Sequence, residues 1–101
     1  MAKGYWVAFG DVSDPEGYKA HVAANAVPFA RYGARFLVRG GQAERPEGAP
    51  RSRVVVLEFP SYEAALACYR SPEYAAAMAR REGKALLDLA IVEGYDGPQP
   101  G

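Results

Sequence analysis

The segment from Arg51 to Tyr74 constrains the fold more than any other part of this chain, because it combines a strand with the helix that follows it. Residues 54–59 (VVVLEF) are almost continuously apolar, which is typical of a buried strand. Pro60 ends the strand because proline cannot donate a backbone hydrogen bond to a neighbouring strand. Ser61 suits the N-cap of the next helix. The segment therefore predicts a strand that has apolar side chains on both faces and leads straight into a helix.

Similar signals predict three further strands and one further helical region. The four expected strands cover residues 4–10, 35–40, 53–59 and 87–94. Asp14 and Pro15 mark the start of a first helix, which Gly33 would end. Pro28 predicts a break or kink in that helix near Ala26 and Val27. The second helical region covers about 61–69 and, after a break at Ser71-Pro72, residues 72–81.

The order strand, helix, strand, strand, helix, strand predicts an α+β protein with the ferredoxin-like βαββαβ arrangement. Right-handed crossovers would place both helical regions on one face of a four-stranded antiparallel sheet. With 101 residues the chain is sized for one domain, which we place at residues 1–95. Residues 96–101 are expected to form a flexible C-terminal tail.

The face of this sheet that lacks helices is the basis for a prediction about assembly. Alternation places Val55 and Leu57 on one side of the third strand and Val54 and Val56 on the other. Hiding 400 Å² of apolar area contributes roughly 10 kcal/mol before the costs of association. A second copy packed sheet to sheet is the simplest cover, so we expect a homodimer; the alternative is a monomer with a solvated face.

Composition excludes some classes of partner. Lys plus Arg and Asp plus Glu each number 12, so there is no broad attraction for nucleic acid or an anionic membrane surface. No apolar run approaches the length of a membrane span, and the N-terminus does not resemble a signal peptide. Cys68 is the single cysteine, which fits a reducing compartment. We therefore expect a cytoplasmic protein that binds neither nucleic acid nor membrane.

Several segments in sequence order resemble one known family. They are YGARFLVRGG (32–41), RVVVLEFPSYEAA (53–65), YRSPEY (69–74) and DLAIVEG (88–94). Together they are similar to the domain-of-unknown-function 1330 family over about residues 3–95. The resemblance implies the dimeric α+β barrel superfamily, in which two ferredoxin-like sheets face each other. It implies no agreed reaction.

Glu58 is a candidate general acid or base because it interrupts an apolar strand and shares a face with Val54 and Val56. A buried carboxyl group has a raised pKa unless it is paired. Arg39 could bind a carboxylate or phosphate on a small ligand with its planar guanidinium. The alternative is that Arg39 or Arg53 simply pairs with Glu58. Alternation along 35–40 places Phe36 and Val38 on one face and Arg39 on the other.

His21 is the only histidine and a second candidate for proton transfer. Its alternative role is structural, at a boundary between core and solvent. With one histidine and no cysteine or acidic motif near it, we predict no metal site. Cys68 is expected to be an apolar filler, and Ser61 and Ser71 to be helix caps.

Aromatic side chains with polar tips could line a ligand cleft, with Arg81 at its end. The residues proposed for this cleft are Tyr18, Tyr32, Tyr69 and Tyr74. Their alternative role is packing between helix and sheet, with Arg81 interacting with a helix C-terminus.

The first functional hypothesis is a small-molecule-handling protein that acts as an enzyme without a cofactor. The resemblance implies it, because relatives in the wider superfamily use the cleft between sheet and helices for isomerase, monooxygenase or decolorising chemistry. Glu58 or His21 would move a proton and Arg39 would hold an anionic group. The alternative is a noncatalytic ligand-binding or structural homodimer.

Overall fold

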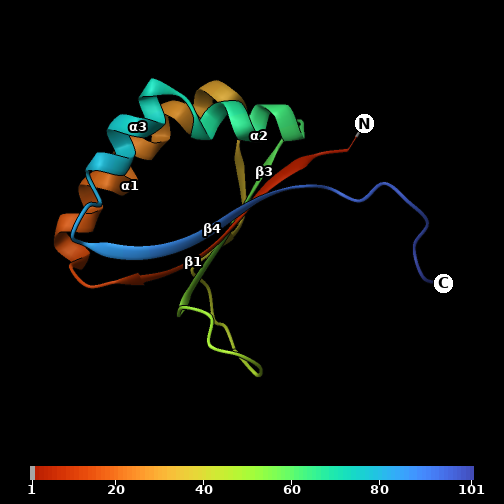
Figure 1. Ribbon diagram of the computed structural model, residues 1–101, viewed down its shortest axis with the longest axis horizontal. Coiled ribbons are helices and arrows are strands. Elements are labelled where there is room, and N and C mark those ends of the chain that lie inside the picture. The colour runs from red at the N-terminus through yellow and green to blue at the C-terminus, as the bar shows by residue number, and fades with distance from the viewer. Residues whose placement is uncertain (1) are drawn as a thin grey trace.

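A four-stranded antiparallel sheet carries three helices on one of its faces in the computed structural model, which describes residues 2–101 (Figure 1). The strands lie in the order β2-β3-β1-β4. Their bounds are Gly4–Val12 for β1, Arg35–Arg39 for β2, Arg53–Phe59 for β3 and Ala85–Glu93 for β4. This is the ferredoxin-like α+β arrangement that the order of elements predicts. The outer strands β2 and β4 flank the pair formed by the first and third strands.

The helices begin where the capping residues predict. α1 covers Pro15–Tyr32, α2 covers Tyr62–Tyr69 and α3 covers Pro72–Ala79. Asp14 accepts a hydrogen bond from the amide of Gly17, and Ser61 and Ser71 accept from the amides of Ala64 and Tyr74, so each helix has a side-chain N-cap. These bonds confirm the capping roles predicted for both serines.

Pro28 does not break the first helix, so the predicted break near Ala26 and Val27 is wrong. α1 is helical from residue 15 to residue 32 and ends at Gly33, whose φ of 72° gives the left-handed cap. Proline removes a single hydrogen-bond donor, and Pro28 is buried against the rest of the fold. Tertiary packing of the last turn therefore offsets the local cost of proline in this helix.

The register of β2 differs from simple alternation. Phe36 lies opposite Leu57, but Val38 lies opposite Val56 and Arg39 opposite Val55. One extra residue is thus inserted in β2 between Phe36 and Val38, which is a β-bulge. A one-residue shift moves every later side chain to the other face of the sheet. The predicted placement of Phe36 and Arg39 on opposite faces is therefore wrong.

The hydrophobic core lies between the sheet and the helices. Trp6, Leu57 and Phe59 from the sheet pack with Phe29 of α1 and Tyr74 of α3. Trp6 is central, since its ring lies 4.9 Å from that of Tyr74 and 5.2 Å from that of Phe59, measured between centroids. The helices cover the even-numbered side chains of β1 and the odd-numbered side chains of β3 and β4.

The opposite face of the sheet carries no helix (Figure 1). Its central register pairs Val7 with Val56 of β3 and with Ala90 of β4. Exposed apolar residues include Leu86 at 63% and Val92 at 46%. We call this surface the open face. It is the bare apolar surface that alternation predicts.

Two segments project away from the body of the domain. The connection between β2 and β3 extends from the sheet on the side away from the helices, and the residues after β4 extend past the N-terminus (Figure 1). Residues 94–101 contain no helix or strand. Within residues 2–101, the helices all fall short of the length and apolar character that a bilayer crossing needs.

Candidate functional site

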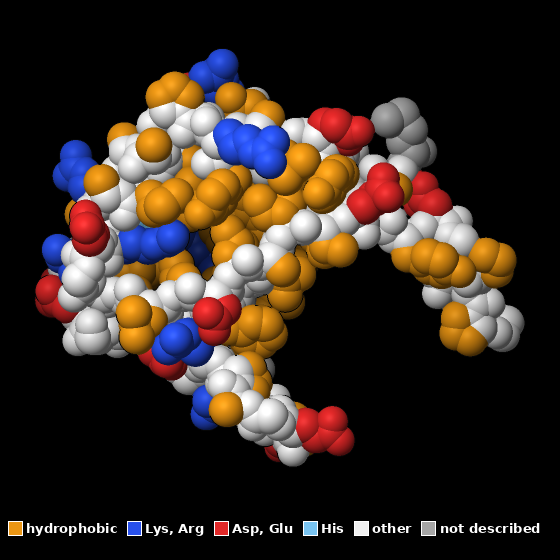
Figure 2. Space-filling model, in the orientation of Figure 1, with side chains coloured by type: hydrophobic (Ala, Val, Ile, Leu, Met, Phe, Trp, Pro, Cys, Tyr) orange, Lys and Arg blue, Asp and Glu red, His pale blue; other side chains and the backbone are white. Residues whose placement is uncertain are grey.

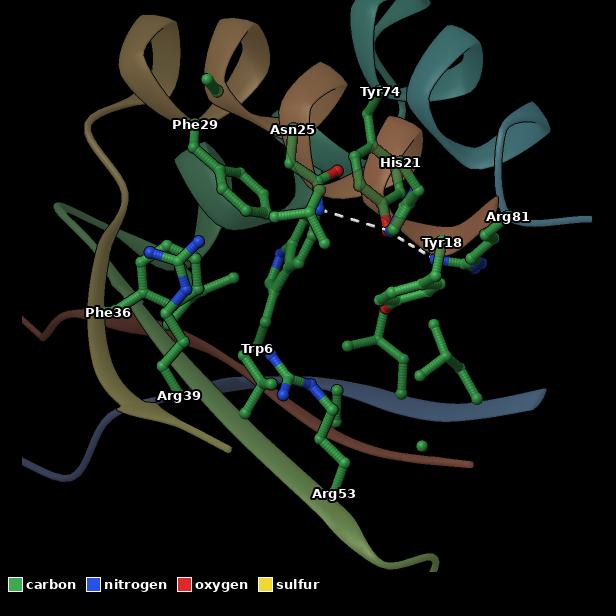
Figure 3. Close-up of a pocket in the computed structure, with 18 residues that line it drawn as sticks. Trp6, Tyr18, His21, Asn25, Phe29, Phe36, Arg39, Arg53, Tyr74 and Arg81 are labelled. Atoms are coloured by element: carbon green, nitrogen blue, oxygen red, sulfur yellow. Dashed lines mark hydrogen bonds between the residues drawn. The ribbon is translucent and has the colours of Figure 1, made fainter. Parts of the chain in front are cut away.

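A cavity of about 220 Å³ lies between the sheet and helices α1 and α3 (Figure 3). In the space-filling view the hollow between the helices and β4 has hydrophobic walls with basic side chains set into it (Figure 2). Its lining residues are Trp6, Ala8, Gly10, Tyr18, His21, Val22, Asn25, Ala26, Phe29, Phe36, Arg39, Arg53, Val55, Leu57, Tyr74, Arg81, Leu87 and Leu89. The small side chains at positions 8 and 10 leave the space that these larger residues enclose.

Trp6 forms a rigid part of the apolar wall. Its indole Nε1–H donates a hydrogen bond of 2.9 Å to the carbonyl oxygen of Ala65. Phe29 meets the indole edge to face, with 5.5 Å between ring centroids. The single polar atom of the indole is thus satisfied by the backbone of α2, and the ring contributes an apolar surface to the cavity.

His21 lies at one end of the cavity and has a neutral imidazole ring. Its Nδ1 lies 2.7 Å from the carbonyl oxygen of Ala77, which can only accept, so Nδ1 carries the proton. In the neutral ring Nε2 is then an acceptor, and the Asn25 amide Nδ2 lies 3.3 Å from it. Burial lowers the pKa of His21, and the nearby charge of Arg81 lowers it further, against the opposing effect of the Ala77 bond.

Tyr74 and Arg81 lie beside this histidine (Figure 3). Arg81 Nη1 donates to the Tyr74 hydroxyl at 2.8 Å. Burial raises the pKa of Tyr74, although the adjacent Arg81 acts in the opposite direction. Tyr18 completes the group, with its ring 5.0 Å from the imidazole between centroids. A phenol, a neutral imidazole and a guanidinium therefore meet at one end of an apolar cavity.

The bulge in β2 brings Arg39 to the cavity. Because Arg39 lies opposite Val55, it shares the inner face of the sheet with Phe36 and Arg53. Its guanidinium lies over the Phe36 ring, 4.1 Å from the centroid. Arg53 rises from β3 beneath it (Figure 3). Bulges next to functional sites commonly reorient a side chain in this way.

Glu58 lies on the open face and not at the cavity. Its carboxylate accepts a hydrogen bond of 3.0 Å from Tyr5 and lies 3.9 Å from the guanidinium of Arg35. The Tyr5 bond raises the pKa of that phenol. The predicted pairing of Glu58 with Arg39 or Arg53 is wrong, because the bulge places Arg39, and alternation places Arg53, on the other face. Glu58 and His21 are not brought together.

The remaining predicted residues divide between the cavity and the packing around it. Tyr18, His21, Arg39, Tyr74 and Arg81 line the cavity, whereas Tyr32 and Tyr69 do not. Tyr69 packs against Trp6 and Tyr74. Tyr32 lies under the guanidinium of Arg31. These two tyrosines have the packing role that the sequence offered as their alternative.

Asn25, Arg53 and Trp6 are among the lining residues that sequence reasoning did not name as site residues. Asn25 lies one helical turn after His21 on α1, and this i, i+4 spacing is a signal that could have paired them. Arg53 was considered only as a partner for Glu58, although its odd number places it on the inner face with Val55. Trp6 was assigned to a face of β1 but to no site. Within residues 2–101, no cluster of His, Cys, Asp or Glu has the composition of a metal site.

The sheet, the helices on one of its faces and the cavity between them define a ferredoxin-like α+β domain. The chain belongs to the domain of unknown function family DUF1330, which matches residues 3–95. No curated protein matches its sequence.

Solved structures share this fold at low sequence identity. A protein of unknown function from Rhodopseudomonas palustris has a TM-score of 0.70 and 20% identity, covering 98% of this chain and 85% of its own. SnoaB, a cofactor-independent oxygenase from Streptomyces nogalater, has a TM-score of 0.62 and 14% identity, covering 99% of this chain and 97% of its own. A dimeric ferredoxin-like protein of unknown function from Thermobifida fusca has a TM-score of 0.57 and 17% identity, covering 91% and 89%.

Proposed function

We propose that this protein binds a small organic molecule in the cavity and transfers a proton to or from it, as an enzyme that needs no cofactor. The observation that carries this proposal is the neutral His21, buried beside Arg81 and Tyr74 at the end of an apolar cavity. A base works best when it is unprotonated at the working pH, and burial lowers the pKa of this histidine. The fold shared with a cofactor-independent oxygenase supports the same class of function.

The proposed step is abstraction of a proton from an acidic C–H or O–H group of the substrate by His21 Nε2. The proton moves to the imidazole, and the electron pair stays on the substrate as an enolate-type or phenolate-type anion. Arg81 is the cation that stabilises this anion, while the Tyr74 hydroxyl donates a hydrogen bond to it. Asn25 must release Nε2 first, and its contact of 3.3 Å is long enough to exchange for the substrate. Glu58 has no part in this step because it faces the other side of the sheet.

An experiment that does not require the natural substrate to be known tests the role of His21 as the base. The protein is incubated in D₂O with a panel of enolisable carbonyl compounds, and NMR follows the exchange of their acidic C–H protons. We expect catalysed exchange for a member of the panel, and its loss in His21→Asn, whose amide can still donate to the carbonyl of Ala77. Exchange that His21→Asn leaves unchanged would exclude histidine as the base.

The second candidate function is noncatalytic ligand binding. The observation that favours it is the Asn25 amide, which already occupies the lone pair of His21 Nε2. In that case the same cavity holds a ligand and the histidine serves only to position α1 against α3. Binding without any proton exchange, in both the wild-type protein and Asn25→Leu, would favour this candidate.

We also propose that the protein is a homodimer built on the open face. Val7, Val56 and Val92 expose apolar surface there, and a dimeric protein shares the fold. A second copy would cover this surface and would enclose the Tyr5–Glu58 hydrogen bond in the interface. A cytoplasmic location, the flexibility of residues 96–101 and the absence of nucleic-acid and membrane partners remain predictions from the sequence.

A further inference from the structure

Positive charge gathers in the cavity without a balancing carboxylate. Arg39, Arg53 and Arg81 all line it, and no Asp or Glu of residues 2–101 does. The whole chain carries 12 basic and 12 acidic residues, so the cavity departs from the balance of the protein. The arginines that form ion pairs in the described residues are Arg31, Arg35 and Arg51 instead.

Two of the cavity arginines are diagonal neighbours on adjacent strands. Arg39 lies opposite Val55, and Arg53 is two residues from Val55 on the same face of β3. Diagonal neighbours of this kind lie about 7–8 Å apart, within reach of two long side chains that converge on one group. Within the described residues, neither guanidinium is hydrogen-bonded or ion-paired, whereas Arg81 is bonded to Tyr74.

Two local features of the backbone hold this pair over the cavity. The bulge in β2 turns Arg39 to the inner face, since regular pairing would send it to the open face. Gly40 then leaves room for Arg53, because a Cβ added at Gly40 would lie 2.4 Å from Arg53 Nη1. Two like charges repel each other, so an anion bound between them would offset this repulsion.

We propose that Arg39 and Arg53 bind the carboxylate of a small aromatic or unsaturated acid, whose body packs on Trp6, Phe29 and Phe36. This inference rests on the proposed small-molecule function and adds the class of ligand. Guanidinium groups match the planar carboxylate and bind it with two parallel hydrogen bonds. The cavity of about 220 Å³ is smaller than the roughly 300–1,000 Å³ of drug-sized sites, so the acid is small.

Calorimetric titration with benzoate and with benzamide, a neutral molecule of the same shape, tests the proposal. We expect benzoate to bind on the order of tenfold more tightly than benzamide, because it gains charge-assisted hydrogen bonds. Arg39→Gln and Arg53→Gln should each weaken benzoate by a similar factor and leave benzamide unchanged. Arg70→Gln removes one positive charge from an exposed residue outside the cavity and should leave both affinities unchanged. Thermal melts of the variants establish that each is folded.

Several outcomes would overturn the proposal. Equal affinities for benzoate and benzamide would leave a small-molecule cavity but remove its preference for an acid. Benzoate binding that survives Ala8→Phe, which adds a phenyl ring to the inner face of β1 in the lining of the cavity, would place the anion elsewhere. Tighter binding of phenyl phosphate would replace the carboxylate by a phosphoryl ligand. Failure of benzoate to bind at millimolar concentration would exclude the arginine pair as an acid site, while the exchange experiment with His21→Asn judges the proposed function separately.

Discussion

The guanidinium of Arg39 lies 4.1 Å from the centroid of the Phe36 ring. In a regular strand, side chains three positions apart point to opposite faces of the sheet. The inserted residue in β2 removes this opposition and brings the cation and the ring to one cavity. Stacking on the ring holds the planar group while its edges stay free to bind a ligand. The bulge in the edge strand β2 is therefore the reason that the positive charge of Arg39 lies at the cavity.

Replacing Gly40 should weaken acid binding and lower stability together. Gly40 has φ of 67°, and its added Cβ would meet the guanidinium of Arg53. We expect Gly40→Ala to reduce the free energy of unfolding by about 1–2 kcal/mol through the left-handed backbone. The displaced Arg53 should also weaken benzoate severalfold in calorimetry.

Gly41→Ala is the matched control, because nothing lies within 4 Å of a Cβ at that position. Gly41→Ala should change neither the free energy of unfolding nor the affinity for benzoate appreciably. A Gly40→Ala protein with unaltered benzoate affinity would show that the glycine does not position Arg53.

Stability should fall as the pH drops from 7 toward 5, because of His21. The folded state lowers the pKa of this group, so the unfolded chain takes up the proton first and gains free energy from it. The contribution is present above about pH 6.5 and is lost as the pH falls through the lowered value. Urea denaturation at several pH values should show this slope in the wild-type protein and a flatter one in His21→Asn.

Asp11 and Glu73 also have shifted pKa values, but they affect stability in a different pH range. Hydrogen bonds from Ser52 and Arg51 lower the pKa of Asp11, and a backbone hydrogen bond and Arg31 lower that of Glu73. Their contributions are lost below about pH 4, which separates them from His21. If the free energy of unfolding changes with pH equally in the wild type and in His21→Asn between pH 7 and 5, His21 is not the group responsible.

Cys68 should not react with thiol reagents while the protein is folded. Its side chain has no exposed surface, and burial raises the pKa of the thiol to about 12. A thiolate is the reactive form, so modification by a disulfide reagent at pH 8 should require unfolding. Ala67→Cys places a thiol on the exposed neighbouring position and should react within the mixing time in the native state. Rapid labelling of Cys68 itself would mean that α2 opens readily.

A charge in the centre of the open face should separate the proposed dimer. Val56 lies opposite Val7 on that face, so Val56→Lys would bury an unpaired charge in each subunit at a cost of several kcal/mol. Light scattering at low micromolar concentration should give the mass of two chains for the wild type and one for the variant. Ala67→Lys, on an exposed helix position, should remain dimeric. A wild-type mass of one chain would remove the dimer proposal.

Local signals in the sequence were sufficient for most of the fold. Pro60, Ser61 and Ser71 mark real boundaries because capping and proline chemistry act within a few residues. Pro28 misled because the helix is held by packing with α2 and α3, which no local signal reports.

The site was harder to predict from the sequence than the fold, because it depends on the register of the strands. Counting alternate residues along 35–40 cannot detect an inserted residue, so Arg39 was placed with Glu58 and away from Phe36. The position of Arg53 on the inner face follows from the alternation that was applied to Val55. Arg53 was missed because it was considered only as an ion-pair partner of Glu58. His21 and Tyr74 could be named singly, but their meeting requires the contact between α1 and α3.

Trp6 is the only tryptophan of the chain, and it lies in the wall of the cavity with its indole nitrogen bonded to Ala65. Its fluorescence is therefore an intrinsic reporter of occupancy that needs no label. A molecule entering the cavity alters the surroundings of this one emitter, so a plate of candidate compounds can be surveyed by emission alone.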